Sequence, residues 1–334
     1  MVTKISVKEA LQKKDAIFID TRTPKEFAED HLPNAINMPI FSNDERAIIG
    51  TIYKKISQDK AIEKGIELFS KRLPGFMEEI NQYKDQELII YCWRGGMRSK
   101  TAVALLDALK YNVKQLDGGH KKYRRYVIDS LENYQFKPKL IVLWGLTCTG
   151  KTNILEKFTN ALDLEGLAQH RGSLYGGIGL TPNNQKRFES LFLHRLNELK
   201  NEKYIFVEGE SKKIGNIQIP DFFYKIMKKS KHVLIKKSLE GRVKLAVAEY
   251  FSSPEAIVKI KEITASLNKV ISKKHREQAV KFLDNQEYVK AAEILLEFYY
   301  DPLYNHTLKE IDFSFEITNN DVDETAKELK KIKK

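Results

Sequence analysis

The sequence predicts an α/β protein with two domains, each built on a parallel sheet. Through the first 130 residues, short apolar runs typical of strands alternate with segments whose apolar residues recur at helical spacing. A second series of strand, loop and helix begins near residue 139. The length of 334 residues suits two domains of about 100–200 residues each.

Three strands and three helices are predicted in the first domain, which we place at residues 1–128. The strands are expected at residues 16–20, 87–92 and 112–119, and the helices at residues 6–14, 61–73 and 99–110. Residues 121–139 are polar and basic and include Pro138, so we predict a connecting helix or linker there, with the linker proper at residues 129–138.

The second domain is predicted at residues 139–334. Its apolar runs, which are expected to be buried strands, lie at residues 139–145, 204–210, 232–238 and 312–318. From about residue 240 onward the apolar spacing is helical, apart from the last of these strands. We therefore expect an α/β domain with a helical C-terminal extension.

Composition excludes several classes of protein. Hydrophobic residues make up 42% of the chain and charged residues 31%, which excludes a disordered or fibrous protein. No stretch approaches the roughly 20 apolar residues that span a bilayer, and residues 1–20 contain no apolar signal core. We therefore expect a cytoplasmic protein without a membrane partner. Its two cysteines, Cys92 and Cys148, are too few for a disulfide framework.

The chain is basic, with 57 Lys and Arg against 45 Asp and Glu and a net charge of +12. This excess suits a polyanionic partner such as nucleic acid, and a generally lysine-rich composition explains it equally well. The bias is strongest in residues 91–125, which hold nine basic and two acidic residues.

A reactive cysteine is predicted at the end of the strand at residues 87–92. Cys92 is followed by two glycines, which let the loop amides turn inward, and by the start of a helix, whose dipole favours a thiolate. Arg94 and Arg98 add positive charge. A buried structural cysteine is the alternative, but the glycines and arginines favour catalytic roles for Cys92, Arg94 and Arg98.

A phosphate-binding loop is predicted at residues 145–152. The run GLTCTGKT matches G-x-x-x-x-G-K-[ST] and stands between a predicted strand and a predicted helix. Its backbone amides would surround an anion, Lys151 would neutralise that anion, and Thr152 is the candidate ligand of Mg²⁺. The motif does not identify the molecule that carries the phosphate, so nucleotide binding stays open. The phosphate-binding candidates are Gly145, Thr147, Thr149, Gly150, Lys151 and Thr152.

The first 125 residues resemble the rhodanese domain. The run DTRTPKEFAEDHLPNAINMP at residues 20–39 is similar to the N-terminal signature of that family, with Asn34 in place of its usual glycine. The loop from Cys92 to Arg98 spans seven residues, one more than is common in sulfurtransferases of this fold, so we expect a wider cradle that suits phosphorus or selenium. We expect Asp20 and Arg22 to form a structural ion pair.

The chain as a whole resembles the tRNA 2-selenouridine synthase family, a rhodanese domain fused to a P-loop domain. The resemblance rests on this order of domains, on CWRGGMRS, and on the runs DLEGLAQHRGSLYGG, VEGESKKIGNIQIP and YYDPLY. Cys148 departs from the family, which usually has glycine there. Cys148 is either a passive replacement or a second reactive thiol.

The resemblance implies conversion of a 5-substituted 2-thiouridine at the tRNA wobble position to 2-selenouridine. It also implies selenophosphate and geranyl diphosphate as substrates, an S-geranyl-2-thiouridine intermediate, and a selenophosphate-supplying enzyme as a candidate partner. Two acidic residues end the strand at 204–210, where P-loop proteins have a metal-positioning carboxylate, but the usual Asp is absent. Candidates for a second part of the site are His170, Arg171, Ser173, Glu208 and Glu210.

The tRNA backbone is expected to contact the basic stretch that follows the cysteine loop, because phosphate neutralisation is the main sequence-independent source of RNA affinity. Two other classes of function stay open. One is a rhodanese-type sulfurtransferase with a nucleotide-regulated P-loop domain, and the other is a non-enzymatic nucleic-acid-binding module. The tRNA-binding candidates are Lys121, Lys122, Arg124 and Arg125.

Overall fold

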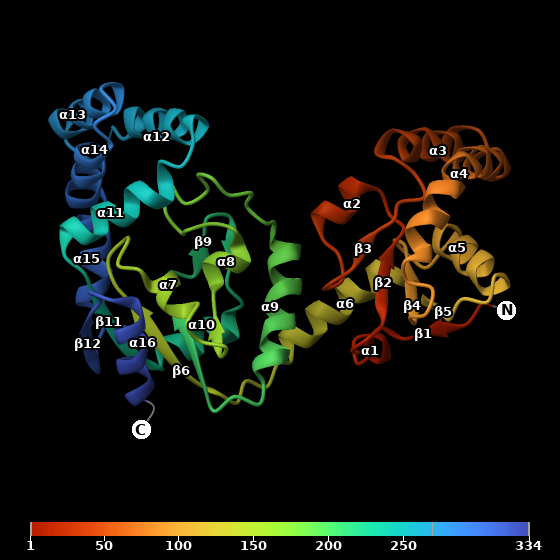
Figure 1. The fold of residues 1–334 in the computed structure, drawn as a ribbon, viewed down its shortest axis with the longest axis horizontal. Helices are drawn as coiled ribbons and strands as arrows, with labels where there is room; N and C mark the ends of the chain where they lie inside the picture. Colours follow the sequence, from red (N-terminus) through yellow and green to blue (C-terminus); the bar gives the residue numbers. More distant parts are fainter. Residues whose placement is uncertain (1, 269, 333–334) are drawn as a thin grey trace. The chain divides into compact units, whose positions relative to one another are not determined.

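The computed structural model describes residues 2–268 and 270–332 (Figure 1). The chain divides into two compact units. The first comprises Met1–Tyr134 with Glu189–His194, and the second comprises Gln135–Phe188 with Arg195–Lys334. Each contains one five-stranded parallel sheet with helices around it, which confirms the predicted fold class. Among the described residues, no helix combines the length and the apolar character needed to cross a membrane.

The sheet of the first unit has the strand order β1-β5-β4-β2-β3, and every neighbouring pair is parallel. The central strand β4 is buried along its whole length and ends one residue before Cys92. The carboxyl end of a central parallel strand is the usual place for a ligand site in such sheets. The strands are β1 (Lys4–Ile5), β2 (Ile17–Asp20), β3 (Ile36–Asn37), β4 (Leu88–Tyr91) and β5 (Val113–Leu116).

Helices α1 to α4 of the first unit begin at side-chain caps, whereas α5 and α6 begin at glycines. Ser6, Thr23 and Ser42 each form a capping box with a glutamate three residues later, which satisfies backbone amides at the start of the helix. Helices α2 and α3 contribute no buried residue, although α3 is 13 residues long. The helices are α1 (Val7–Ala10), α2 (Pro24–Glu29), α3 (Asn43–Lys55), α4 (Gln58–Asn81), α5 (Met97–Ala108) and α6 (Gly119–Glu132).

Residues 121–132, where a connecting helix or linker was expected, form most of α6, which belongs to the first unit. Tyr123, Val127 and Leu131 recur along one face of α6 and are buried. This apolar stripe packs the helix onto the unit, so only residues 133–138 connect α6 to the next strand.

The sheet of the second unit has the order β12-β11-β6-β8-β7, again with parallel neighbours only. Strand β6 is in the middle, and its carboxyl end enters the phosphate-binding motif (Figure 1). A small antiparallel pair lies outside this sheet. The strands are β6 (Lys139–Trp144), β7 (Ala161–Leu162), β8 (Tyr204–Glu208), β9 (Lys213–Ile214), β10 (Ile217–Gln218), β11 (Lys231–Lys236) and β12 (Phe315–Thr318).

The chain is mainly helical from residue 239, as predicted, with β12 returning to the sheet. Residues of α11, α12, α13, α14 and the π-helix η1 share one apolar core. The helices of this part of the chain are α7 (Lys151–Leu155), α8 (Leu164–Ala168), α9 (Gln185–Leu199), α10 (Asp221–Lys228), α11 (Leu239–Tyr250), α12 (Pro254–Ser266), α13 (Lys273–Asp284), α14 (Tyr288–Leu295), η1 (Leu296–Tyr300), α15 (Asp301–Lys309) and α16 (Val322–Lys331).

Candidate functional site

The phosphate-binding motif forms the loop between β6 and α7. Gly145 has a φ of 159°, and a Cβ there would lie 2.5 Å from the carbonyl oxygen of Ile235. Gly150 has a φ of 83°, and its Cβ would lie 2.7 Å from Asn319 Nδ2. Glycine is therefore required at both positions, by backbone conformation at Gly150 and by close approach at both.

Distant side chains hold this loop in place. Asn319 Nδ2 donates a hydrogen bond of 2.7 Å to the carbonyl oxygen of Thr149, and Arg242 Nε donates one of 2.8 Å to that of Thr147. The guanidinium of Arg242 also forms an ion pair with Asp301 in the YYDPLY run. The sequence analysis missed Arg242 and Asn319, which follow the adjacent strands β11 and β12.

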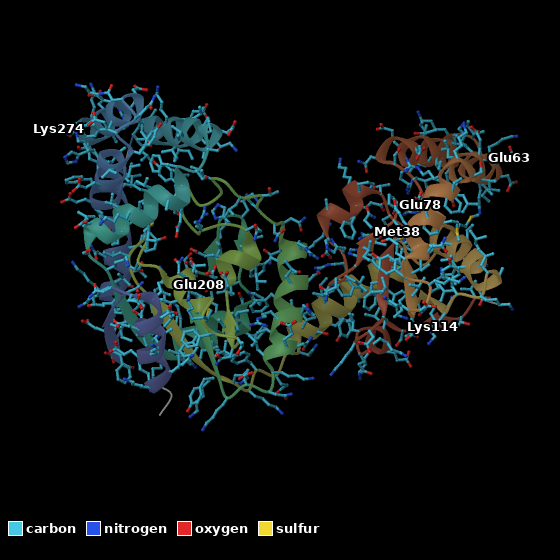
Figure 2. All side chains as sticks on the ribbon, viewed as in Figure 1. Met38, Glu63, Glu78, Lys114, Glu208 and Lys274 are labelled. Carbon is cyan, nitrogen blue, oxygen red and sulfur yellow. The ribbon has the colours of Figure 1, made fainter. Side chains whose placement is uncertain are left out.

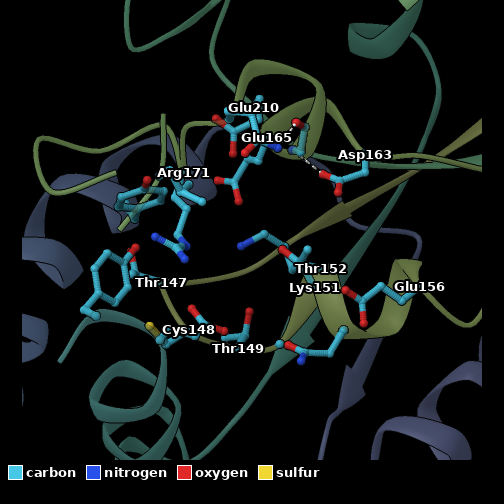
Figure 3. Close-up of a pocket in the computed structure, with 18 residues that line it drawn as sticks. Thr147, Cys148, Thr149, Lys151, Thr152, Glu156, Asp163, Glu165, Arg171 and Glu210 are labelled. Atoms are coloured by element: carbon cyan, nitrogen blue, oxygen red, sulfur yellow. Dashed lines mark hydrogen bonds between the residues drawn. The ribbon is translucent and has the colours of Figure 1, made fainter. Parts of the chain in front are cut away.

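A cavity of about 250 Å³ opens above the loop (Figure 3). Lys151 and Arg171 extend into it from opposite sides, and Glu165 and Glu210 stand near Arg171. Of the predicted residues, Thr147, Thr149, Gly150, Lys151, Thr152, Arg171 and Glu210 line the cavity. Tyr250 and Tyr304 also line it, together with Glu156, Asp163 and Glu249.

Three carboxyl groups lie at this cavity near the ends of β7 and β8. Glu208 and Glu210 are buried, and Glu165 is half-buried. Glu208 lies inside the second unit (Figure 2), where its Oε1 accepts a hydrogen bond of 2.7 Å from the amide of Glu165. Burial raises the pKa of Glu165, Glu208 and Glu210, and neighbouring carboxylates raise the pKa of Glu208 and Glu210 further. Lys151 and Arg171 are the cations of the cavity lining and would attract an anion, and they share the cavity wall with the carboxyl groups of Glu156, Asp163, Glu165, Glu210 and Glu249.

Gly145 of the predicted phosphate-binding group and three residues of the predicted second group do not line the cavity. A Cβ on Gly215 would meet the His170 ring at 2.9 Å, so His170 packs against the β9–β10 turn. Ser173 Oγ lies 3.0 Å from the hydroxyl of Tyr300. Glu208 is buried behind the cavity at the end of β8. These residues support the site, and only Arg171 and Glu210 of the predicted second group reach the space above the loop.

A smaller apolar cavity of about 30 Å³ adjoins the phosphate loop at Cys148. Burial raises the pKa of the Cys148 thiol to about 12, so this thiol is protonated at neutral pH. A protonated thiol is a weak nucleophile, so this finding favours Cys148 as a passive replacement for glycine over Cys148 as a second reactive thiol. The cavity is lined by Thr147, Cys148, Tyr175, Ala246, Tyr250, Phe251, Ile260, Ala292, Leu295, Leu296 and Tyr300.

The cysteine loop of the first unit is held by the turn that follows β5. The amide of His120 donates a hydrogen bond of 2.9 Å to the carbonyl oxygen of Cys92. A Cβ on Gly119, whose φ is 57°, would lie 2.3 Å from that same oxygen. The Cys92 side chain is buried, and Ser99 Oγ donates to its Sγ at 3.2 Å. The sequence analysis missed Ser99, one turn into α5.

The two predicted arginines of this loop have different surroundings. Arg98 donates two hydrogen bonds to Glu26, of 2.8 and 3.3 Å, so its charge is paired with a carboxylate of α2. Burial opposes ionisation of Glu26, but Arg98 holds the pKa of Glu26 below its usual value. Arg94 is exposed, and both arginines line a groove that also contains Cys92.

The acidic residue and arginine of the rhodanese-like signature form the expected structural pair. Arg22 Nη2 lies 2.6 Å from Asp20 Oδ2, both side chains are buried, and Arg22 also donates to the carbonyl oxygen of Asp30. His31 stacks on Phe27 with ring centroids 3.8 Å apart. Asn34 adopts a φ of 58°, as expected for a residue replacing glycine in a turn.

The basic residues of α6 do not all face solvent. The Arg124 side chain is 11% exposed and lies 2.6 Å from Glu189 Oε2, so it is part of an internal ion pair and is removed from the expected tRNA surface. Lys122 pairs with Asp117, and Arg125 pairs with Asp129 at 2.9 Å, but both are largely exposed. Lys121 is exposed as well.

Comparisons with known proteins cover both units. Residues 138–333 match the model of the tRNA 2-selenouridine synthase AAA domain, and residues 3–126 match that of the rhodanese-like domain. The tRNA 2-selenouridine synthase of Hydrogenovibrio crunogenus is 33% identical over 92% of this chain and 94% of its own. That of Shewanella piezotolerans is 30% identical over 88% and 89%, and that of Nitrosomonas europaea is 33% identical over 72% and 65%.

The matched ranges include the cysteine loop and the phosphate loop, and they follow one another in the predicted domain order. One of the two models spans more than half of the chain. They confirm the resemblance predicted from the sequence. The chain belongs to the tRNA 2-selenouridine synthase family.

Proposed function

We propose that this protein is a transferase that replaces the sulfur of a 5-substituted 2-thiouridine at the tRNA wobble position by selenium. The reaction has two halves, geranylation of the sulfur by geranyl diphosphate and selenation by selenophosphate. The observation that carries the proposal is that the phosphate-loop cavity, into which Lys151 and Arg171 extend, borders an apolar cavity in the second unit. Geranyl diphosphate has two matching parts, an anionic diphosphate for the phosphate-loop cavity and an apolar isoprenoid chain for the apolar cavity.

The first half is assigned to the second unit. The loop amides, Lys151 and Arg171 would bind the diphosphate, and the chain would lie along Tyr250 with its end in the apolar cavity. The thiouridine sulfur attacks C1 of the geranyl group, so an S–C bond forms, the C–O bond breaks and diphosphate leaves. Lys151 offsets the charge that develops on the leaving oxygen.

Mg²⁺ suits the same position, although no cluster of three metal-binding side chains occurs at residues 2–268 and 270–332. The Thr152 hydroxyl and the Glu210 carboxyl line the cavity, and the phosphate oxygens of the substrate would supply further ligands. The ion would neutralise diphosphate charge. The raised pKa of Glu210 agrees with a carboxyl that ionises when a cation binds beside it.

The second half is assigned to the cysteine loop of the first unit. The Cys92 thiolate attacks C2 of the nucleobase, so a bond between C2 and the cysteine sulfur forms, the bond between C2 and the geranylated sulfur breaks, and geranylthiol leaves after taking up a proton. Selenium of selenophosphate then attacks C2, the C2–Se bond forms and the Cys92 thiolate leaves. Water then cleaves the P–Se bond. Cys92 is the nucleophilic group of this half, and Arg94 is the exposed cation beside it. The partners implied are the tRNA and an enzyme that supplies selenophosphate.

The test is mass spectrometry of a tRNA anticodon stem-loop that contains 2-thiouridine, incubated first with geranyl diphosphate and then with selenophosphate. We expect a mass gain of one geranyl group, followed by its loss together with exchange of sulfur for selenium. ATP or GTP turnover without RNA, with no geranylation, would instead support the nucleotide-regulated sulfurtransferase.

A further inference from the structure

A groove of about 1270 Å³ runs beside Cys92 on the first unit. Its walls come from α3, α4, the start of α2 and the loop at residues 92–98. The apolar part of the lining includes Tyr53, Ile62, Ile66, Phe69, Trp93 and Met97. The steps assigned so far use only the cysteine end of this groove.

The apolar walls of the groove are open to solvent. Tyr53 is 58% exposed, Ile66 is 66% exposed and Met97 is 53% exposed. The helix α3 has no buried residue among those described, so the hairpin of α3 and α4 covers the core only in part. Exposed apolar side chains gathered in one concave surface are typical of a binding site.

The charged part of the lining is mainly basic. Six cations line the groove, against the two carboxylates Glu26 and Glu29. Glu26 is already ion-paired with Arg98, so the charge offered to a ligand is positive. The cations are Lys25, Arg46, Lys54, Lys55, Arg94 and Arg98. An apolar floor with a basic rim matches a ligand that is both apolar and polyanionic.

We propose that this groove binds the geranyl chain of the S-geranylated tRNA nucleotide during selenation. The inference rests on the proposed function and specifies where its intermediate is held. The chain would pack against Tyr53, Ile66 and Met97, while the basic rim contacts the neighbouring phosphates of the anticodon loop. Because Cys92 lines the same groove, the carbon–sulfur bond that must break would lie near the cysteine loop.

This arrangement gives a reason for the geranyl group in the second half. The bulky apolar S-geranyl group is present only on RNA that has completed the first half, so 2-thiouridine itself would not compete for the cysteine loop. The groove thereby orders the two halves of the reaction. Burial of the chain also keeps water from C2 until selenium arrives.

The test compares Ile66→Asp with Ile56→Asp. Ile56 follows α3 in the same hairpin and is 70% exposed, but it does not line the groove. Dissociation constants are measured by fluorescence anisotropy for two anticodon stem-loops, one with S-geranyl-2-thiouridine and one with 2-thiouridine. We expect Ile66→Asp to weaken binding of the geranylated RNA by roughly tenfold, since this corresponds to lost burial of about two methylene groups.

Binding of the 2-thiouridine RNA should change by less than about twofold in both variants, because this RNA has no geranyl chain that either side chain could contact. Ile56→Asp should bind the geranylated RNA like the wild type, because Ile56 does not line the groove. Circular dichroism checks folding, and Met97→Ala is a second groove variant that keeps the surface uncharged. Equal affinity of Ile66→Asp and the wild type for the geranylated RNA would overturn the inference.

Two further outcomes separate this inference from the function on which it depends. If the wild type selenates geranylated RNA and Ile66→Asp does so with the same KM, the groove assignment fails while the proposed function stands. If the wild type neither prefers nor selenates the geranylated RNA, both fail. Dissociation of a wild-type dimer by Ile66→Asp, with RNA preference unchanged, would instead assign the groove to a second copy of the chain.

Discussion

Replacing Lys151 by alanine should remove the geranylation half. The Lys151 side chain lines the phosphate-loop cavity, and its Nζ donates to the carbonyl oxygen of Gly145 at 3.2 Å. Two unit charges about 4 Å apart interact by about 4 kcal/mol at an effective dielectric constant of about 20. If the diphosphate binds as proposed, most of this energy stabilises the leaving oxygen in the transition state.

A loss of about 4 kcal/mol corresponds to a nearly thousandfold lower rate, since about 1.4 kcal/mol is tenfold. The assay follows geranylated anticodon stem-loop by mass spectrometry under single-turnover conditions. Lys151→Arg is the matched variant, because it keeps the charge but changes the shape of the cation, and it should retain part of the activity. Melting temperatures confirm that both variants fold.

Geranylation by Lys151→Ala within about tenfold of the wild-type rate would refute this reasoning, because the expected loss is nearly a hundred times larger. A variant that geranylates normally but no longer incorporates selenium would assign the phosphate loop to selenophosphate. Loss of both halves with intact RNA binding would indicate that the cavity serves both phosphorus compounds.

The remaining predictions concern the cysteine loop, the buried carboxyls and the basic helix. Cys92→Ser should abolish selenium incorporation and leave geranylation intact, because a hydroxyl is a far weaker nucleophile at neutral pH; wild-type-like selenouridine yield by nucleoside mass spectrometry would contradict it. Glu210 has a raised pKa, so the folded protein retains a proton that the unfolded chain releases above a pKa of about 4.3, and stability falls as the pH rises through this window. Glu210→Gln should therefore raise the melting temperature increasingly between about pH 5 and pH 8, and a pH-independent difference would exclude this cause. Charge reversal of Lys121 and Arg125 should weaken RNA binding and flatten its salt dependence. An unchanged slope of log Kd against log salt would show that the tRNA binds another surface. Arg124→Glu should instead lower the free energy of unfolding by about 3 kcal/mol, because it breaks a buried ion pair, and an unchanged urea midpoint would show that this pair contributes little.

The conformations of both candidate loops could be predicted because each loop is encoded in a few consecutive residues. The loop that begins at Cys92 and the loop at residues 145–150 each follow an apolar strand and lead into a helix, and this local pattern is visible in the sequence. The fold class followed from the same alternation. Family membership followed from longer runs such as DLEGLAQHRGSLYGG.

Residues that act through long-range contacts could not be predicted in this way. Arg242 and Asn319 reach the phosphate loop from 95 and 170 residues away, and nothing in their neighbours along the chain distinguishes them from other polar residues after a strand. Arg124 carries the same charge as Lys121, so composition placed both on the surface. Only the packing of α6 shows that Arg124 is turned toward Glu189.

The hydrogen bond between Asn319 and Thr149 has a consequence for biosynthesis. The phosphate loop leaves the ribosome about 170 residues before the side chain that fixes it, whereas the hydrogen bonds of Cys92 in the described part of the chain are made with Gly96, Ser99 and His120, at most 28 residues away. During synthesis, which exposes N-terminal domains first, the cysteine loop can therefore mature while the phosphate loop still lacks its anchor. A prematurely terminated chain that ends before β12 would retain a folded thiol site but an unanchored phosphate site, and would be a natural target for proteolytic quality control.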